Sequence, residues 1–399
     1  MSKLDKLICE LCPNGVEYRA LGDVCKLITG ATPSKKLSSY WNDGTIPWMS
    51  SGEVSLKRVW STEAKITQLA YDKTSTTLVP PHSIVIALAG QGKTRGKVAI
   101  TEIELCTNQS LCSIVCSNEL DYKFLYYYLD GKYEELRSIS NGDGSRGGLS
   151  LKILSPYKIP VPPLDVQREI VRILDNFTEL TAELTAELIA RKKQYEYYRD
   201  KLLALDVFKG RASKCNVRTF RIDELCNISR GKVISKDYIK EHPGHYPVYS
   251  SQTENDGVLG CISEYAYDGE FITWTTDGAN AETVFFRNGK FSITNVCGLL
   301  SPKNGDLNLR YLYYVLSKDA RQYVNKGMGN AKLMSNVMGG IKIAVPPLSI
   351  QNRIANVLDN FDAICSDLNM GLPAEIEARQ KQYEYYRDKL LTFKERISI

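Results

Sequence analysis

The side chains best suited to chemistry in this chain are polar and basic groups in glycine-rich loops. Residues 90–96, Gly-Gln-Gly-Lys-Thr-Arg-Gly, resemble a phosphate-binding P-loop, but Ala87 stands where that motif requires its first glycine. The residues after Thr94 also read as a strand, whereas a P-loop leads into a helix. We therefore interpret these residues as a hairpin loop that enters a DNA groove, where arginine and lysine read guanine and glutamine reads adenine. An exposed basic turn is the alternative. The candidate DNA-binding residues of this loop are Gln91, Lys93, Thr94 and Arg95.

Three further polar or glycine-rich regions carry candidates of the same kind. Residues 140–148 and their counterpart at 325–332 combine glycines with cations, so they could seat DNA phosphates or be plain surface turns. Residues 249–255 and 275–280 are rich in the amides and hydroxyls that read base edges, whereas Trp274 is expected in the core. The candidates in these regions are Ser145, Arg146, Ser250, Ser251, Gln252, Thr253, Thr276, Asn280, Lys326 and Lys332.

Signatures of catalysis and metal binding are missing from the sequence. It contains neither an adenine-methyltransferase tetrapeptide (Asn/Asp-Pro-Pro-Tyr) nor a G-x-G-x-x-G after a predicted strand, and its three histidines fit no triad. The eleven cysteines are scattered and lack the paired spacing of a zinc site, so we expect reduced thiols. We assign no metal and no cofactor to this chain, and expect it to perform no chemistry alone.

The composition is that of a protein with well-developed hydrophobic cores. Of 399 residues, 43% are hydrophobic and 24% charged, which excludes wholesale disorder. No stretch approaches the ~18 apolar residues of a membrane span and the start does not read as an export signal, so we expect a cytoplasmic protein. The net charge of +5 is compatible with nucleic acid but is weak support for it.

An internal duplication is the most informative feature of the chain. Residues 193–203 (KQYEYYRDKLL) recur identically at 381–391. The tetrapeptides VPPL and LDNF also occur twice, and a weaker similarity relates residues 21–30 to 222–231. Each half therefore holds one variable globular part followed by one nearly identical segment.

The nearly identical segments have the spacing of long amphipathic helices. Apolar residues three, four and seven apart predict one helix over residues 166–205, about 60 Å long, with Asp165 as its N-cap. The second copy, roughly 349–394, is expected to break at Gly371-Leu-Pro373 and to restart with Pro373 near its first turn. We predict that the copies pair as an antiparallel coiled coil.

The two globular parts read as mixed α/β (α+β) domains. Short β-branched runs alternate with glycine, asparagine and aspartate, and a tyrosine-rich helix is predicted at 122–137 and again at 309–325. The predicted organisation is a first recognition domain at 1–160, a helical spacer at 161–207, a second recognition domain at 208–345 and a second spacer at 346–399. Internal pseudo-two-fold symmetry follows from the repeat.

These features together resemble the specificity subunit of a type I restriction-modification system. The resemblance covers essentially the whole chain and rests on the duplicated helix segments, the Thr-Ala-Glu-Leu repeat at 181–188 and the two openings at 21–30 and 222–231. It implies two target recognition domains that each read half of an asymmetric, bipartite site in double-stranded DNA. It also implies that the helices set the spacing and dock two modification (methyltransferase) subunits. S-adenosylmethionine, ATP and magnesium are then expected on the methyltransferase and restriction/motor subunits.

Two other interpretations stay open at this point. The chain could be a coiled-coil scaffold whose globular parts bind peptides, or an enzyme with an unrecognised site. Independently of function, residues 4–21 resemble residues 201–222, which predicts that the first 20 residues pack near the C-terminal end of the second helix.

Overall fold

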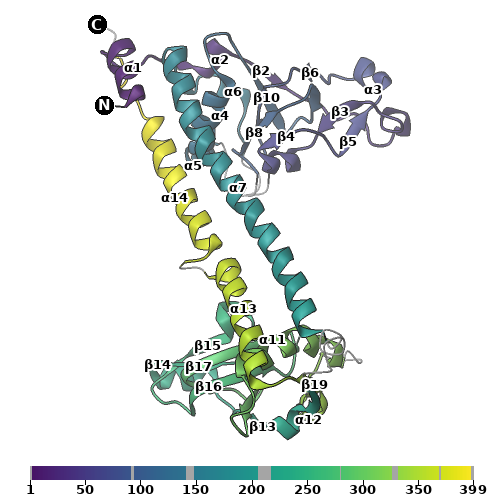
Figure 1. Ribbon diagram of the computed structural model, residues 1–399. Coiled ribbons are helices and arrows are strands. Elements are labelled where there is room, and N and C mark those ends of the chain that lie inside the picture. Colours follow the sequence, from purple (N-terminus) through teal and green to yellow (C-terminus); the bar gives the residue numbers. More distant parts are fainter. Residues whose placement is uncertain are drawn as a thin grey trace. The chain divides into compact units, whose positions relative to one another are not determined.

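The computed structural model describes residues 2–90, 94–140, 148–204, 217–278, 280–325, 331–367 and 370–396. They form two compact units, and each contains β-sheets and helices (Figure 1). The first unit is Met1–Glu183 with Ile376–Ile399, and the second is Leu184–Glu375. The mixed α/β architecture predicted from the sequence is confirmed.

The globular part of the first unit is built on three sheets. Their strand orders are β2-β10-β7-β8-β4, β5-β3-β9-β6 and β1-β11. Its elements are α1 (Lys3–Leu11), β1 (Tyr18–Ala20), α2 (Leu21–Val24), β2 (Cys25–Thr29), β3 (Ile46–Met49), β4 (Arg58–Val59), β5 (Ala64–Ile66), α3 (Gln68–Lys73), β6 (Leu78–Val79), β7 (Ile84–Ala87), β8 (Val98–Thr101), β9 (Leu105–Thr107), β10 (Leu111–Cys116), α4 (Tyr122–Gly131), α5 (Tyr133–Ser138), α6 (Leu151–Leu154) and β11 (Lys158–Pro160).

The globular part of the second unit repeats this plan with longer strands. A six-stranded sheet has the order β13-β18-β16-β17-β14-β15, and β12 pairs with β19. Its elements are β12 (Arg218–Arg221), α9 (Ile222–Leu225), β13 (Cys226–Arg230), α10 (Lys236–Glu241), β14 (Pro243–Tyr249), β15 (Val258–Ile262), β16 (Tyr267–Thr275), β17 (Val284–Ile293), β18 (Cys297–Pro302), α11 (Leu309–Asp319), α12 (Ser335–Gly340) and β19 (Lys342–Val345).

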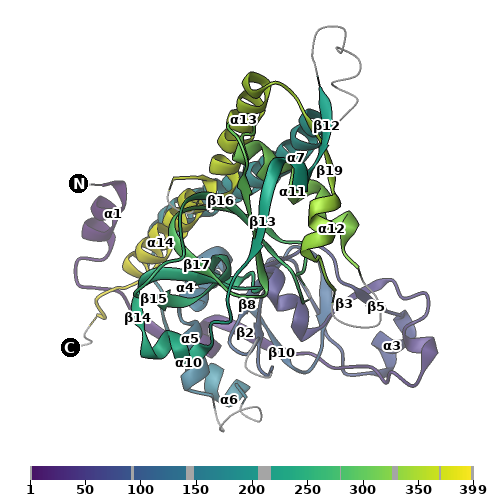
Figure 2. The ribbon, with the colours of Figure 1, turned by 90° about the horizontal axis from the view of Figure 1, so that it is seen from below.

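The largest sheet of each unit packs against the predicted tyrosine-rich helix, α4 in the first unit and α11 in the second. In the second unit α11 packs against β16 and β17, and its other side contacts the helical segment (Figure 2). Trp274 is fully buried beneath it, and its indole N–H donates to the carbonyl of Leu333 at 2.9 Å. The prediction that Trp274 belongs to the core is confirmed.

The long predicted helix is α7 (Leu164–Leu203), 40 residues without a break. It begins at Leu164, so the prediction of Asp165 as N-cap is wrong. Asp165 lies inside the first turn, where its negative charge interacts favourably with the positive end of the helix dipole. The second copy is interrupted as predicted, giving α13 (Leu348–Ser366) and α14 (Leu372–Leu390). At the interruption, a Cβ on Gly371 would lie 2.6 Å from the carbonyl oxygen of Ala363, so only glycine fits there.

Each unit contains one half of the predicted helix pairing. In the first unit Phe177 of α7 stacks on Tyr386 of α14, with ring centroids 5.4 Å apart. In the second unit Tyr198 of α7 stacks on Phe361 of α13 at 5.8 Å. Phe177 and Phe361 are equivalent in the repeat, as are Tyr198 and Tyr386, so the same aromatic pair is made twice with the helices exchanged.

The N-terminal residues pack where the sequence repeat predicts. The Val16 N–H donates to the carbonyl of Lys394 at 2.8 Å, and the Arg396 N–H donates back to Val16 at 2.9 Å. The Tyr18 hydroxyl donates to the carbonyl of Phe393 at 3.3 Å. Residues directly after α14 therefore hold the N-terminal segment inside the first unit, and this prediction is confirmed.

Candidate nucleic-acid interface

Five segments of the first unit meet at one end of its sheets, and main-chain hydrogen bonds join them. The Ala31 N–H donates to Thr107 at 2.9 Å, and the Asn108 N–H donates to Met49 at 3.1 Å. Leu88, directly after β7, donates to Ser110 at 2.8 Å and accepts from Leu149 at 2.8 Å. We call this region the first loop end, made of residues 30–36, 50–53, 88–90, 94–96, 108–111 and 148–149.

The second unit has the same arrangement, which we call the second loop end, made of residues 231–236, 249–253, 275–278, 280–283, 294–297 and 331–333. Lys232 forms a parallel bridge with Thr294, whose N–H donates to Tyr249 at 2.9 Å. Thr276, directly after β16, donates to Val296 at 3.1 Å and accepts from Leu333 at 3.1 Å. Each connection of the first loop end therefore has a counterpart in the second.

The close approach of the backbones explains one residue that the two loop ends share. A Cβ on Gly30 would lie 1.8 Å from the carbonyl oxygen of Thr107, and one on Gly231 would lie 1.9 Å from that of Ile293. Any side chain at these positions would force the segments apart. The glycine that ends each repeated opening, 21–30 and 222–231, is therefore required to assemble the loop end.

The strands that lead into the loop ends are also equivalent. β3 runs parallel to β9 with Met49 opposite Thr107, and β14 runs parallel to β17 with Tyr249 opposite Ile293. Polar residues follow both β3 and β14 directly, and in each case the first two are serines. Within each unit these strands, from separate parts of the chain, bring hydroxyl and amide groups together at one edge.

Comparison with known proteins identifies this duplicated scaffold. The family model described as "Type I restriction modification DNA specificity domain" matches residues 13–192 and again residues 215–378. The chain belongs to this family. The two matches correspond to the two halves that the sequence repeat predicts.

Individual relatives agree with this assignment. The specificity subunit of the type I restriction enzyme EcoR124I/EcoR124II from Escherichia coli is 29% identical over 422 aligned positions, covering 98% of this chain and 97% of the relative. The specificity subunit of the type I restriction enzyme MpnII from Mycoplasma pneumoniae is 45% identical over 204 positions, 51% of this chain and 62% of that protein. A crystal structure of the S subunit from M. genitalium shares the fold, with a TM-score of 0.60, 19% identity and coverage of 94% and 96%.

In this specificity protein the first predicted loop is only partly described. Gln91 and Lys93 lie outside the described residues, and the Thr94 hydroxyl donates to the carbonyl of Ala89 at 3.4 Å. Arg95 is 8% exposed, and its Nε and one terminal nitrogen have no hydrogen-bond partner. The expectation that this loop presents Arg95 at the surface is wrong. The Lys97 N–H donates to the carbonyl of Thr94, so residues 94–97 form a tight turn that leads directly into β8.

The candidates in the second unit gather at its loop end. The Asn280 amide donates to the Thr253 hydroxyl at 2.9 Å, so the predicted loops at 249–255 and 275–280 touch each other. The Ser250 and Thr294 hydroxyls lie 3.3 Å apart, and the Gln252 amide donates to the carbonyl of Val258. Ser251 lies between Ser250 and Gln252 and is half-buried.

Thr276 is at the centre of this loop end but does not reach the surface. It is fully buried, and its hydroxyl donates to the carbonyl of Val296 at 3.0 Å and accepts from Arg230. The interpretation of Thr276 as a surface-exposed contact is therefore wrong, since its position directly after β16 places the side chain inside. It instead fixes the turn at 294–297.

Lys332 also belongs to the second loop end. Its backbone exchanges two hydrogen bonds of 3.0 Å with Asn325 and forms a bridge with Asp277. Ser145, Arg146 and Lys326 lie outside the described residues. Of the glycine-rich phosphate-binding candidates, the structure therefore places Lys332 alone.

Arg287 is a buried cation of the second unit that sequence analysis missed. It is 3% exposed, its guanidinium donates to the Asp256 carboxylate at 2.5 Å and to the Asp256 carbonyl at 2.8 Å, and it stacks on Tyr249 with 3.6 Å to the ring centroid. Asn255, Asp256 and Gly257 all have positive φ, at 49°, 51° and 77°. Such a turn needs support from its surroundings. Arg287 therefore stabilises the turn at 255–257, which follows the candidates at 250–253. Its partners are distant in sequence, so no local pattern reveals this role.

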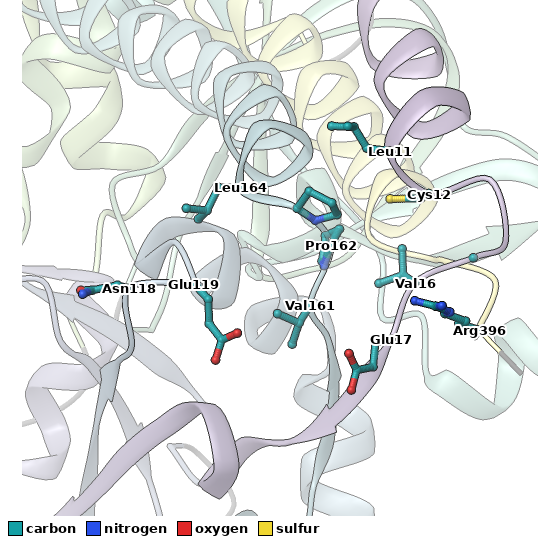
Figure 3. Close-up of a pocket in the computed structure, with 12 residues that line it drawn as sticks. Leu11, Cys12, Val16, Glu17, Asn118, Glu119, Val161, Pro162, Leu164 and Arg396 are labelled. Atoms are coloured by element: carbon teal, nitrogen blue, oxygen red, sulfur yellow. The ribbon is translucent and has the colours of Figure 1, made fainter. Parts of the chain in front are cut away.

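A cavity of about 500 Å³ lies elsewhere in the first unit. Figure 3 shows its lining, in which the charged residues Glu17, Glu119 and Arg396 lie beside apolar residues such as Val16 and Pro162. It lies where the N-terminal segment, the residues after α14 and the start of α7 meet, and it includes no residue of the first loop end. Among the residues that the structure describes, no group of His, Cys, Asp or Glu is placed to hold a metal ion.

Three buried thiols, those of Cys106, Cys112 and Cys226, are unsuited to nucleophilic chemistry. The ten cysteines in the described ranges are unpaired. Burial raises the pKa of Cys112 and of Cys226 to about 12, and that of Cys106 to about 11. These side chains stay protonated at neutral pH and serve as small apolar core residues. No helix in the described ranges is both long and apolar enough to span a membrane.

Proposed function

We propose that this chain is the DNA specificity subunit of a type I restriction-modification enzyme. Each loop end reads one half of a bipartite, asymmetric site in double-stranded DNA, and the helices set the spacing between the halves. The observation that supports this proposal most strongly is the pair of loop ends, which share one scaffold but display different side chains. Two readers of this kind are what an asymmetric site requires.

The repeated helix segment supplies a matching surface for partner subunits. Tyr197 and Tyr385 are equivalent, and they are 59% and 61% exposed. Lys201 lies over the Tyr197 ring at 5.5 Å and Lys389 over the Tyr385 ring at 5.8 Å. A surface presented twice fits two copies of one partner. We therefore propose that the helices dock two methyltransferase subunits, which bind S-adenosylmethionine, and that ATP and magnesium are bound by restriction/motor subunits.

The proposal is tested by footprinting the chain together with its methyltransferase partner on duplex DNA. We expect protection of two short tracts separated by a fixed gap, with affinity that falls steeply as salt is raised, because phosphate contacts release counterions. Assembly that is insensitive to salt, without duplex affinity, would instead identify a protein scaffold.

The ruler role has its own test. Insertion of one more Thr-Ala-Glu-Leu after Leu188 adds about 6 Å of helix. We expect the gap between the protected tracts to lengthen by about two base pairs, since DNA rises 3.4 Å per pair. Thr185→Ser, which keeps the length of the helix, is the matched control. A footprint that the insertion leaves unchanged would rule out the ruler.

A further inference from the structure

We propose that Gln109 and Asn295 are equivalent base-reading residues, one in each unit, and that each carboxamide recognises an adenine. This inference rests on the proposed DNA-reading function and adds the residues and the base. Neither residue was among the sequence-based candidates. Their equivalence is visible only in the structure, because they occupy the same place in the two loop ends.

Both residues are the second residue of a four-residue turn. In the first unit the Leu111 N–H donates to Asn108 at 3.2 Å, and in the second the Cys297 N–H donates to Thr294 at 3.0 Å. Each turn connects a strand that pairs in parallel at the loop end, β9 or β17, to the next strand along the chain, β10 or β18. Gln109 and Asn295 are both exposed at the tips of these turns.

Hydrogen bonds from buried residues hold both turns in place. The carbonyl of Ser110 accepts from the Leu88 N–H at 2.8 Å, and the carbonyl of Val296 accepts from both the N–H and the hydroxyl of Thr276, at 3.1 and 3.0 Å. Leu88 and Thr276 are buried. A rigid support lowers the entropy lost when the side chain above it binds. Specific base contacts need such placement.

The segment that begins at each anchoring glycine, Gly30 or Gly231, carries a small side chain two residues after the glycine. The Thr32 hydroxyl donates to the Gln109 carbonyl oxygen. In the second unit Val233 takes the place of Thr32, is 80% exposed, and follows Lys232, the bridge partner of Thr294. A valine exposed to this extent on a folded surface fits a contact with an apolar group, and the thymine methyl is the apolar group of the major groove.

The chemistry of the carboxamide selects the base. It offers a donor and an acceptor side by side, which pair with N7 and the N6 amino group of adenine. In Gln109 the oxygen keeps a second lone pair while it accepts from Thr32. Exposed lysines lie in the same segments as Thr32 and Val233, namely Lys35 and Lys36 in the first unit and Lys232 and Lys236 in the second. They suit phosphate contacts that fix register without reading sequence.

The test uses the full complex of this chain with its methyltransferase subunits, expressed in a host whose methylated motifs are sequenced. The unchanged chain must first yield a two-part motif, and its absence would contradict the proposed function itself. Given that motif, we expect Gln109→Ala to relax one A·T position in one half and Asn295→Ala to relax one A·T position in the other. At the relaxed position, discrimination measured by duplex binding should fall about tenfold to a hundredfold.

Isosteric variants guard against misfolding. Gln109→Glu and Asn295→Asp preserve shape but replace the donor by an acceptor, so the affected position should shift from adenine toward cytosine, whose N4 amino group donates. The matched controls are Gln68→Ala in the first unit and Asn227→Ala in the second, both exposed amides outside the loop ends, and these should leave the motif unchanged. If the Glu and Asp variants assemble and methylate the original motif without relaxation, the inference is overturned while the proposed function stands.

Discussion

Single residues tie distant parts of each unit together through buried polar groups. Glu169 of α7 is almost fully buried, and its carboxylate lies 2.7 Å from Arg172 and 2.8 Å from Lys3 of α1. Hydrogen bonds from Arg172 and then Lys3 lower the pKa of Glu169 to about 2. The N-terminal helix is therefore attached to α7 by an ionised carboxylate.

Because the folded-state pKa of Glu169 is depressed, this ion pair stabilises the protein fully above the ordinary glutamate pKa of about 4.3. Its contribution is lost as the pH falls from there toward 2. We expect Glu169→Gln to be less stable than the unchanged chain at pH 7 and to show a smaller loss of stability between pH 5 and pH 3. Urea unfolding at a series of pH values measures this difference, and parallel pH curves for the two proteins would contradict it.

A buried glutamine performs the same structural task in both units. The Gln351 side chain accepts from the Asn308 N–H at 2.8 Å and donates to the carbonyls of Asp306 and Pro346 at 3.0 and 2.8 Å. Gln167 makes the equivalent contacts with Asp121, Glu119 and Pro162. Each glutamine joins the start of a helical segment to the start of the tyrosine-rich helix.

Gln351→Leu removes these three hydrogen bonds but keeps the approximate volume. Since buried polar groups of the main chain are left without partners, we expect a loss of about 2–4 kcal/mol in the free energy of unfolding. Denaturant titration measures it, with the exposed Gln322→Leu as the control for the change of residue type. A loss no greater than that of the control would show that water replaces the amide.

At the scale of elements, the repeated helices pair through aromatic contacts that the repeat makes twice. In the second unit the Tyr198 and Phe361 rings are nearly parallel, with an interplanar angle of 25°. In the first unit the angle between Phe177 and Tyr386 is 21°. The half-exposed tyrosines cover the phenylalanines, so each pair closes the edge of its helix contact.

A double-mutant cycle on Tyr198→Ala and Phe361→Ala isolates the stacking contribution. We expect a coupling energy of about 0.5–1.5 kcal/mol, the range of stacked aromatic pairs. Tyr385→Ala combined with Phe361→Ala is the matched control, because Tyr385 is 61% exposed and its ring contacts Tyr386 rather than Tyr198, so its coupling should be close to zero. Equal coupling in both cycles would mean that the stacking is incidental.

At the scale of the whole molecule, the repeat continues through the two ends of the chain. A Cβ on Gly15, whose φ is 95°, would lie 2.5 Å from the carbonyl oxygen of Lys394, so the two terminal segments are in tight backbone contact. The N-terminal segment thereby completes the first unit. Its counterpart in the repeat, residues 201–222, is instead a single uninterrupted stretch of the sequence.

Deletion of residues 2–12 removes α1 and its Lys3–Glu169 ion pair. We expect a lower midpoint of thermal unfolding and weaker assembly with the methyltransferase partner. The control is Lys3→Met, which removes the ion pair and keeps the apolar contacts of Leu4, so it should have the smaller effect. Unchanged stability and assembly on deletion would refute a structural role for the N-terminal segment.

The sequence alone determined the features that local or repeated patterns encode. An identical 11-residue segment reveals the duplication, 3.6-residue periodicity predicts α7, and Gly371-Leu-Pro373 predicts the break between α13 and α14. The family resemblance follows from the same residues. Helical periodicity and backbone restriction act within a few residues, which is why they can be read without a structure.

The tertiary structure alone decided which loops are equivalent and which side chains reach the surface. Gly30 and Gly231 differ by 201 in residue number, but Gln109 and Asn295 by 186, so no constant offset aligns the two loop ends. Arg95 and Thr276 look like surface loop residues and are buried, whereas the unremarkable Asn295 is exposed at a supported turn. Burial and convergence depend on hydrogen bonds between strands far apart in the chain, which no local pattern encodes.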